Sequence, residues 1–225
     1  MKETESQPTP YPLWLAYVLP MVAFMVLTTV ESSASKANYI WLYLAKVVMV
    51  TATLLWFKRP LKDIRPKANV LIPAILVGLA VFIEWVLLDK WIPYPHLGHR
   101  TSLDPFAAID SPILRSLFLV ARFYGLVVMV PVMEELFWRS FLLRYFSDSY
   151  FTELPIGTFS WEAFFTVAVG FSLVHTEWLV AFICACAYAL LLRQTKSIFA
   201  CIVAHGTTNL ALGVYVILTH DWVYW

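Results

Sequence analysis

The stretch "PVMEELFWRSFLLR", residues 131–144, sets four charged side chains inside an apolar run that extends over residues 113–146. About 20 apolar residues are enough to cross a bilayer as a helix, and this run is longer. At about 1.5 Å per residue it would measure about 50 Å, so it predicts a kinked or two-part helix. Gly125 and Pro131 are the natural positions for a bend. The stretch therefore predicts a membrane helix that carries charge at depth.

The rest of the chain has the same apolar character. Sixty per cent of the 225 residues are apolar and 14% are charged, and the mean hydropathy is +0.72. A soluble domain carries about 25% charged residues. The formal net charge of +1, with no basic cluster of the kind that binds nucleic acid, predicts no nucleic-acid partner. The composition indicates an all-α, polytopic membrane protein embedded in a lipid bilayer.

Apolar runs of spanning length recur along the whole chain, without an internal repeat or a second domain. They predict a single membrane domain over residues 1–225, with a polar N-terminal tail over residues 1–12 and a first span that is retained rather than cleaved as a signal peptide. We expect about seven transmembrane helices, or eight if the long run forms two, over residues 13–30, 39–57, 70–88, 113–146, 161–175, 178–192 and 197–218.

The charge of the loops predicts how the chain is oriented. Five basic residues lie between the second and third spans, and Arg193 and Lys196 lie between the sixth and seventh. Cytoplasmic loops carry an excess of lysine and arginine. In a seven-span arrangement both loops fall on the same side as the N-terminus. We therefore expect that side to be cytoplasmic and the C-terminus to face the other compartment.

Ionisable side chains at bilayer depth are costly and by default mark functional sites. Lys46 and Glu84 lie at similar depths on the second and third predicted helices. Neighbouring antiparallel helices would bring them together, so we expect a structural ion pair between them. Arg144, near the end of its helix, is expected to extend to the cytoplasmic surface.

The two adjacent glutamates of the opening stretch point in different directions, because neighbouring residues on a helix are about 100° apart. Glu135 has Arg139 four residues later, with the acid N-terminal to the base, which is the favoured order for a salt bridge. Glu134 instead has Phe137 and Trp138 three and four residues later, and no partner on its own helix. A carboxyl group in such surroundings is a candidate general base.

Two further helices bring polar side chains to the same level. Phe171 and His175 are four residues apart on one predicted helix, as are His205 and Asn209 on another. At about 1.5 Å per residue, Glu134 and the two histidines fall within roughly 8 Å of one another in depth. A carboxylate and an imidazole can activate water, and an uncharged amide donor suits an oxyanion. The set favours hydrolysis of an amide bond, and a proton relay would place its residues in the same way.

The same residues leave a metal-dependent reaction open as an alternative. Two histidines and a carboxylate form a familiar zinc set, so zinc held by Glu134, His175 and His205 is one reading. Asn209 is a poor ligand for most metals. We favour a site without metal or other cofactor, in which the catalytic residues are Glu134, His175, His205 and Asn209.

Three motifs in these helices resemble a known family in their order and spacing. They are Glu134-Glu135-x-x-x-Arg139, Phe171-x-x-x-His175 and His205-x-x-x-Asn209. They resemble the motifs of the CPBP family, the intramembrane proteases related to the CAAX prenyl endopeptidase and also called Abi proteins. The resemblance covers about residues 126–213. The chain also resembles the bacterial, exosortase-associated subgroup of CAAX prenyl protease-related proteins, in the stretches "WLAYVLPMVAFM" (14–25), "VPVMEELFWRSFLLRYF" (130–146) and "RQTKSIFACIVAHGTTNLALGVYV" (193–216).

The resemblance implies a helical membrane fold around a cavity that is reached from the membrane and the cytoplasmic side. It implies that Glu134 activates water with help from His175, and that His205 and Asn209 stabilise the oxyanion. The supporting residues of the site would be Glu135, Arg139 and Phe171. Earlier naming of the family as metalloproteases keeps zinc as an alternative.

The resemblance also implies a setting, which is the bacterial plasma membrane, with a membrane-associated peptide or protein as substrate. A protein of an exosortase system is an expected partner. Two departures matter. The family enzyme that trims prenylated proteins has eight spans, and bacteria generally lack prenylated CAAX substrates, so that substrate does not carry over. A proton-relay transporter and a non-catalytic accessory or immunity protein are the alternative functions.

Overall fold

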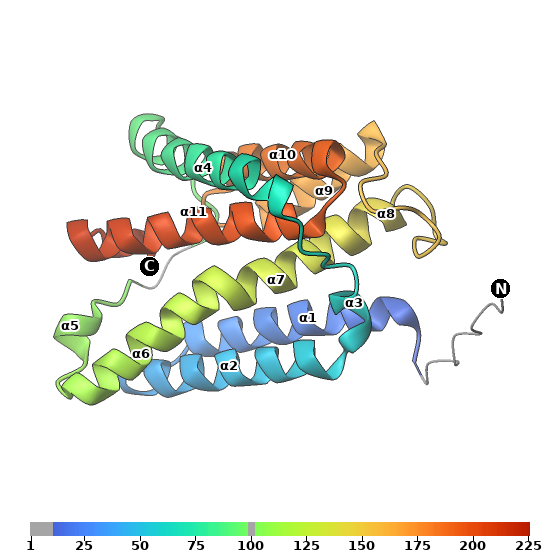
Figure 1. Ribbon diagram of the computed structural model, residues 1–225. Coiled ribbons are helices and arrows are strands. Elements are labelled where there is room, and N and C mark those ends of the chain that lie inside the picture. Colours follow the sequence, from blue (N-terminus) through green and yellow to red (C-terminus); the bar gives the residue numbers. More distant parts are fainter. Residues whose placement is uncertain (1–10, 99–101) are drawn as a thin grey trace.

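The computed structural model describes residues 11–98 and 102–225, and all regular secondary structure in these residues is helical (Figure 1). The predicted all-α fold is therefore confirmed. The α-helices are α1 (Leu13–Ser32), α2 (Lys36–Trp56), α3 (Lys58–Leu61), α4 (Leu71–Trp91), α5 (Pro105–Ala108), α6 (Pro112–Tyr124), α7 (Val130–Glu134), α8 (Leu143–Tyr145), α9 (Trp161–Leu173), α10 (Trp178–Thr195) and α11 (Ile198–Thr219). Two π-helical segments, η2 (Gly125–Met129) and η3 (Glu135–Leu142), flank α7, and 3-10 turns cover Ala68–Val70 and Trp222–Tyr224.

Six helices in the described part of the chain are long and apolar enough to cross a membrane, which confirms a polytopic membrane protein. They are Leu13–Ser32, Asn38–Trp56, Ala68–Trp91, Pro112–Tyr145, Trp178–Thr195 and Ile198–Thr219. The seventh predicted span, over residues 161–175, is the shorter apolar helix α9. Its 13 residues rise about 20 Å, whereas the hydrocarbon core of a bilayer is about 30 Å thick. The seven or eight expected crossings are therefore six helices of spanning length and one shorter helix.

The long apolar run forms one continuous element from Pro112 to Tyr145, rather than two separate helices. In Figure 1 it runs obliquely between the other helices, and tilt is the usual way for a long helix to fit a bilayer. The helix does not break at either of the expected bend positions, Gly125 and Pro131; π-helical turns lie beside them instead. η2 starts at Gly125, and it ends just before Pro131, which lacks an N–H and crowds the preceding turn. A π turn loosens the regular ladder at that point, so the helix continues through the proline.

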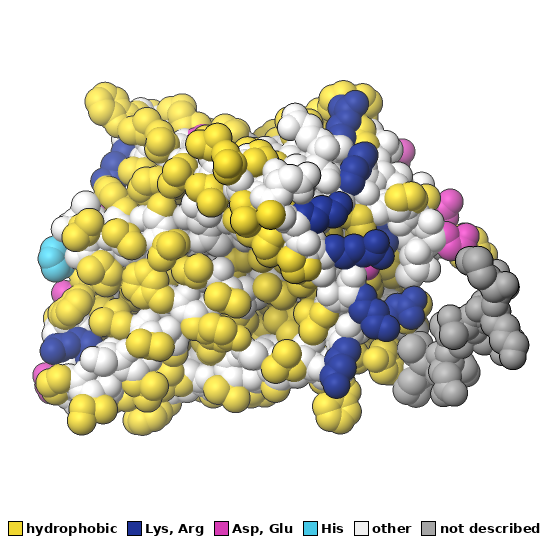
Figure 2. Space-filling model, viewed as in Figure 1, with side chains coloured by type: hydrophobic (Ala, Val, Ile, Leu, Met, Phe, Trp, Pro, Cys, Tyr) yellow, Lys and Arg dark blue, Asp and Glu magenta, His cyan; other side chains and the backbone are white. Residues whose placement is uncertain are grey.

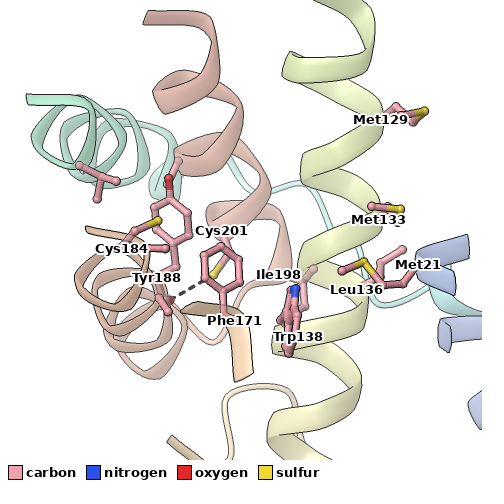
Figure 3. Packing of buried hydrophobic residues seen from close by; sticks show 14 of the residues in the cluster. Met21, Met129, Met133, Leu136, Trp138, Phe171, Cys184, Tyr188, Ile198 and Cys201 are labelled. Atoms are coloured by element: carbon pink, nitrogen blue, oxygen red, sulfur yellow. Dashed lines mark hydrogen bonds between the residues drawn. The ribbon is translucent and has the colours of Figure 1, made fainter. Parts of the chain in front are cut away.

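The oblique element lies between two groups of helices. In Figure 1, α1 and α2 lie on one side of it, and α4, α9, α10 and α11 lie on the other. Within these groups α1 packs on α2, α4 on α11, and α9 on α10. Figure 3 shows that Met129, Met133 and Leu136 point toward α1, whereas Trp138 points the opposite way. The residues of the opening stretch are therefore buried from both sides.

The expected ion pair between Lys46 and Glu84 is wrong. Lys46 pairs with Glu31 of α1, donates a hydrogen bond to Thr28 Oγ1 at 3.2 Å, and lies over the ring of Tyr43. Both carboxyl oxygens of Glu84 are enclosed without a hydrogen-bond partner among the described residues. The reason is the order of helices in space, because α2 packs on α1 and α6, whereas α4 packs on α11 and α10.

Arg144 does not extend to the surface, so that prediction is also wrong. Its side chain is buried and donates to the Asp63 carboxylate at 2.9 Å, to Ser140 Oγ at 2.8 Å and to the Leu154 carbonyl at 3.2 Å. The Tyr17 hydroxyl donates to the same carboxylate at 2.8 Å. This network ties α1, the loop after α3 and the end of the oblique element together.

Replacing Arg144 with glutamine should lower the melting temperature of the purified protein. The change leaves the partly buried Asp63 carboxylate without its cation, which costs about 1–3 kcal/mol, or several degrees in Tm. The control is Arg59→Gln, which removes an exposed arginine of the same region. Equal melting temperatures for the two variants would contradict a stabilising role for the Asp63–Arg144 pair.

Basic side chains gather at one end of the bundle. Figure 2 shows lysines and arginines as a band across one end of the viewed face, while apolar side chains cover most of the rest. The basic residues of the two loops are all exposed; they are Lys58, Arg59, Lys62, Arg65, Lys67, Arg193 and Lys196. We refer to this region as the basic end.

Candidate active site

A cavity of about 370 Å³ lies inside the bundle and brings the four predicted catalytic residues together. Glu134 of α7, His175 after α9, and His205 and Asn209 of α11 all line it, with Phe171 beside them. The cavity extends away from these residues toward the end of the bundle opposite the basic end. Its lining there includes Glu31, Ser32 and Tyr39, where α1 ends and α2 begins, and the C-terminal residues Tyr224 and Trp225.

Glu134 is the last residue of α7 and is followed directly by the π-helical segment η3. Its residue is only 5% exposed, and Oε2 is enclosed without a hydrogen-bond partner among the described residues. A buried carboxyl group without a partner is costly at membrane depth. π-Helical turns often occur at functional sites, and here one begins right after the predicted base.

Glu135 binds two positively polarised partners with one carboxylate oxygen. Its Oε1 accepts from Arg139 Nη1 at 3.1 Å and from His205 Nδ1 at 2.9 Å, and all three side chains are buried. The salt bridge expected from the four-residue spacing is therefore present. The bond to His205 comes from a helix 70 residues later in the chain, and sequence spacing contains no signal for it. The Arg139 guanidinium also packs on the rings of Phe171 and Tyr188.

The hydrogen bonds of the two histidines define which ring nitrogen can take part in chemistry. His205 directs Nδ1 at the Glu135 carboxylate, so Nδ1 carries a proton and donates it in this hydrogen bond. Nε2 is the ring nitrogen that remains for a substrate. His175 directs Nδ1 at the Phe171 carbonyl at 2.7 Å, and its ring stacks on the Phe171 ring at 4.3 Å. A carbonyl oxygen can only accept, so neutral His175 has its lone pair on Nε2.

Asn209 has a structural bond that the sequence did not predict. Its Nδ2 donates to the carbonyl of Leu126 at 2.8 Å, inside the π-helical segment η2. Gly206, one turn earlier, allows the two helices to approach, because a Cβ atom there would lie 2.7 Å from the Val127 carbonyl oxygen. One amide hydrogen of Asn209 is thus used to hold α11 against η2, and the second remains for an oxyanion.

The zinc alternative requires donor atoms that lie close together. Zinc ligands lie about 2.0–2.2 Å from the ion, so the donor atoms must approach one another closely. Within the described residues, the set of three potential ligands whose donor atoms lie within 4.8 Å of one another is Asp89, His96 and Glu177. Glu134, His175 and His205 do not form such a set. In this structure their donor atoms could share one ion only after the side chains move, and the chelation experiment described below decides between glutamate and metal chemistry.

One family of known proteins matches the part of the chain that builds the site. Residues 116–211 match the family model described as "Rce1-like: Type II CAAX prenyl endopeptidase Rce1-like". No curated protein and no solved structure matches the chain significantly. The matched segment is less than half of the chain, but it contains all three motifs, from Glu134 to Asn209. Residues 116–211 of this polytopic helical membrane protein are therefore similar to the Rce1-like, type II CAAX prenyl endopeptidase family.

Proposed function

We propose that the protein is an intramembrane endopeptidase that hydrolyses a peptide bond of a membrane-associated protein or peptide with a glutamate-activated water. The observation that carries the proposal is the buried carboxyl group of Glu134, whose Oε2 atom has no hydrogen-bond partner among the described residues, in the same cavity as two histidines. The match of residues 116–211 to a peptidase family supports the same reaction class.

The proposed reaction assigns one step to each group. Glu134 takes a proton from water, and the oxygen of that water attacks the scissile carbonyl carbon. The negative charge that develops on the carbonyl oxygen is stabilised by the His205 ring, through Nε2, and by the second amide hydrogen of Asn209. Nε2 of His175 accepts a hydrogen bond from the attacking water. Glu134 then delivers its proton to the leaving nitrogen, and the C–N bond breaks.

The Glu135 carboxylate acts through His205 rather than on the substrate. A carboxylate bonded to Nδ1 fixes the orientation of the ring, as in other carboxylate–histidine pairs. In the proposed mechanism Glu135 is therefore a positioning residue.

The direct test is cleavage of peptides by the purified protein in detergent or lipid nanodiscs, followed by mass spectrometry. The probe is a pool of apolar peptides, and cleavage should be absent in the Glu134→Gln variant. If the wild-type protein yields no cleavage products in detergent or in nanodiscs, the proposal fails and the non-catalytic alternative gains support.

Chelation separates glutamate chemistry from metal chemistry. We expect cleavage to continue unchanged after treatment with a strong chelator, because the proposed base and oxyanion donors are all protein groups. The acidic cluster of Asp89, His96 and Glu177 could bind added zinc outside the cavity. His96→Gln is therefore the matched control. Activity lost with chelator and restored by zinc in both wild type and His96→Gln would contradict the metal-free mechanism.

We further propose that the basic end is cytoplasmic, as the excess of lysine and arginine indicates. The cavity extends toward the opposite end, so the substrate would enter from the non-cytoplasmic side. The family resemblance instead implies access from the cytoplasmic side, so the position of the cavity and the resemblance differ on the side of entry. The bacterial plasma membrane and an exosortase-system partner belong to the proposal and rest on resemblance alone.

Labelling with a membrane-impermeant maleimide in intact cells tests this orientation. Ser32→Cys, at the cavity end, should react, whereas Lys58→Cys, at the basic end, should react only after the membrane is opened. Both positions are exposed, and two of the three natural cysteines are buried and the third is half-buried. The reverse pattern would place the cavity end in the cytoplasm.

A further inference from the structure

Arg122, near the end of α6, places a cation in the wall of the cavity. Its guanidinium carbon lies 4.8 Å from the centre of the Tyr43 ring and 5.4 Å from that of the Trp225 ring. Both rings cover faces of a planar group whose N–H donors point out along its edge. Aromatic faces hold the guanidinium in place without neutralising its charge.

The charge of Arg122 is not balanced by the described residues around it. The carboxylate that also lines this end of the cavity is Glu31, and it is already paired with Lys46. No ion pair joins Arg122 to a carboxylate of the described chain, and its Nε atom is enclosed without a hydrogen-bond acceptor. An unpaired cation at membrane depth is expensive. This end of the cavity therefore has two cations, Lys46 and Arg122, for the one carboxylate of Glu31, which leaves one positive charge unpaired.

A second donor beside Arg122 also lacks an acceptor. The indole Nε1 of Trp225 is enclosed without a hydrogen-bond partner in the part of the chain that the structure describes. The preceding residue, Tyr224, holds this segment in place, because its hydroxyl donates to Asp89 at 2.6 Å. Burial and the neighbouring Asp89 carboxylate raise the pKa of Tyr224, so the hydroxyl stays protonated as a donor. Two adjacent donors without acceptors, one of them charged, indicate a site for an anion.

The position of Arg122 relative to Glu134 sets a distance along a bound peptide. The two residues are 12 positions apart on one continuous helical element, which is at most about 18 Å at 1.5 Å per residue. An extended peptide covers that distance with about five residues at roughly 3.3 Å each. The cavity is lined by both residues, so one ligand can reach both.

We propose that Arg122 binds a carboxylate of the peptide substrate, located within about five residues of the bond that is cleaved. The inference rests on the proposed function and gives it a specificity determinant. A single carboxylate matches the single unbalanced charge, and arginine binds carboxylates with two parallel hydrogen bonds. The carboxylate is either a chain terminus or an acidic side chain, and the experiment below separates the two.

Peptide binding to the Glu134→Gln protein, which cannot cleave, tests the proposal in nanodiscs of phosphatidylcholine. The probes are fluorescent pools of apolar decapeptides with a free C-terminal carboxylate, with a C-terminal amide, and with an amide plus one internal aspartate. We expect a carboxylate to strengthen binding by about ten- to a hundredfold, as for a hydrogen bond to a charged group. Arg122→Gln in the same background should reduce this ratio to about one, and Arg122→Lys should retain part of it.

The matched control is Arg115→Gln, on the same helix. Arg115 donates to the Ile109 carbonyl, lies over the Phe106 ring and does not line the cavity. It should leave the ratio unchanged, and melting temperatures show that each variant is folded. If the Glu134→Gln protein that retains Arg122 binds peptides with and without a carboxylate equally well, or binds none of the pools, the proposal is overturned. A preference that appears only when anionic phosphatidylglycerol is present also overturns it, since the ligand would then be a lipid headgroup.

The outcome for the proposed function is read separately, from cleavage by the protein with Glu134 intact. A carboxylate preference in binding without cleavage of any pool would reject the peptidase and leave Arg122 as an anion site. Cleavage without a carboxylate preference would reject the role of Arg122 and leave the peptidase. Cleavage that favours carboxylate peptides, and loses this preference in Arg122→Gln, supports both.

Discussion

Replacing Glu134 with glutamine should abolish peptide cleavage while leaving the protein folded. The amide has the same shape but cannot take a proton from water, and a general base alone contributes about 10²–10⁴-fold in rate. The carboxyl group has no ion pair to lose, and its Oε2 atom has no hydrogen-bond partner among the described residues. Removing a buried, unpaired acid should therefore keep the melting temperature the same or raise it.

The matched control for this variant is Glu162→Gln, which changes an exposed glutamate of α9. It should retain full activity and an unchanged melting temperature. The comparison separates a loss of chemistry from a loss of folded protein. A Glu134→Gln protein that cleaves at the wild-type rate would remove Glu134 from the mechanism.

The sequence predicts the fold class well because the physics of the bilayer acts on local composition. Each long helix is visible as an apolar run, since every backbone group in lipid must be bonded within its own segment. The ends of α1, α10 and α11 fall within a few residues of the predicted ones. The short α9 and the continuity of the long element were not predictable in this way, because they depend on tilt and on neighbouring helices.

The residues of the candidate site are visible from the motifs, but the bonds among them are not. Four-residue spacing predicts the bond between Glu135 and Arg139, which is local. The bonds from Glu135 to His205 and from Asn209 to Leu126 depend on which helices are neighbours. The same limit explains the wrong pairing of Lys46, whose acid lies on α1 rather than α4.

Conservative changes at Glu135 should cause the second large effect, because this carboxylate holds two partners at once. Glu135→Gln leaves the buried Arg139 without an anion, and breaking a buried pair costs about 3–5 kcal/mol. Expression and melting temperature should fall sharply. Arg139→Met should lower both as well, because it removes the cation that pairs with Glu135. Thermal unfolding of each purified variant is the measurement.

The double variant Glu135→Gln/Arg139→Met separates stability from catalysis. With both charges gone neither member of this pair is left as an unpaired buried ion, so much of the lost melting temperature should return. Cleavage should stay low, because Nδ1 of His205 then faces an amide, which no longer holds the ring in position as the carboxylate does. Recovery of both stability and activity in the double variant would mean that Glu135 serves only as the partner of Arg139. Recovery of stability alone would show that the Glu135 carboxylate both pairs with Arg139 and positions the His205 ring.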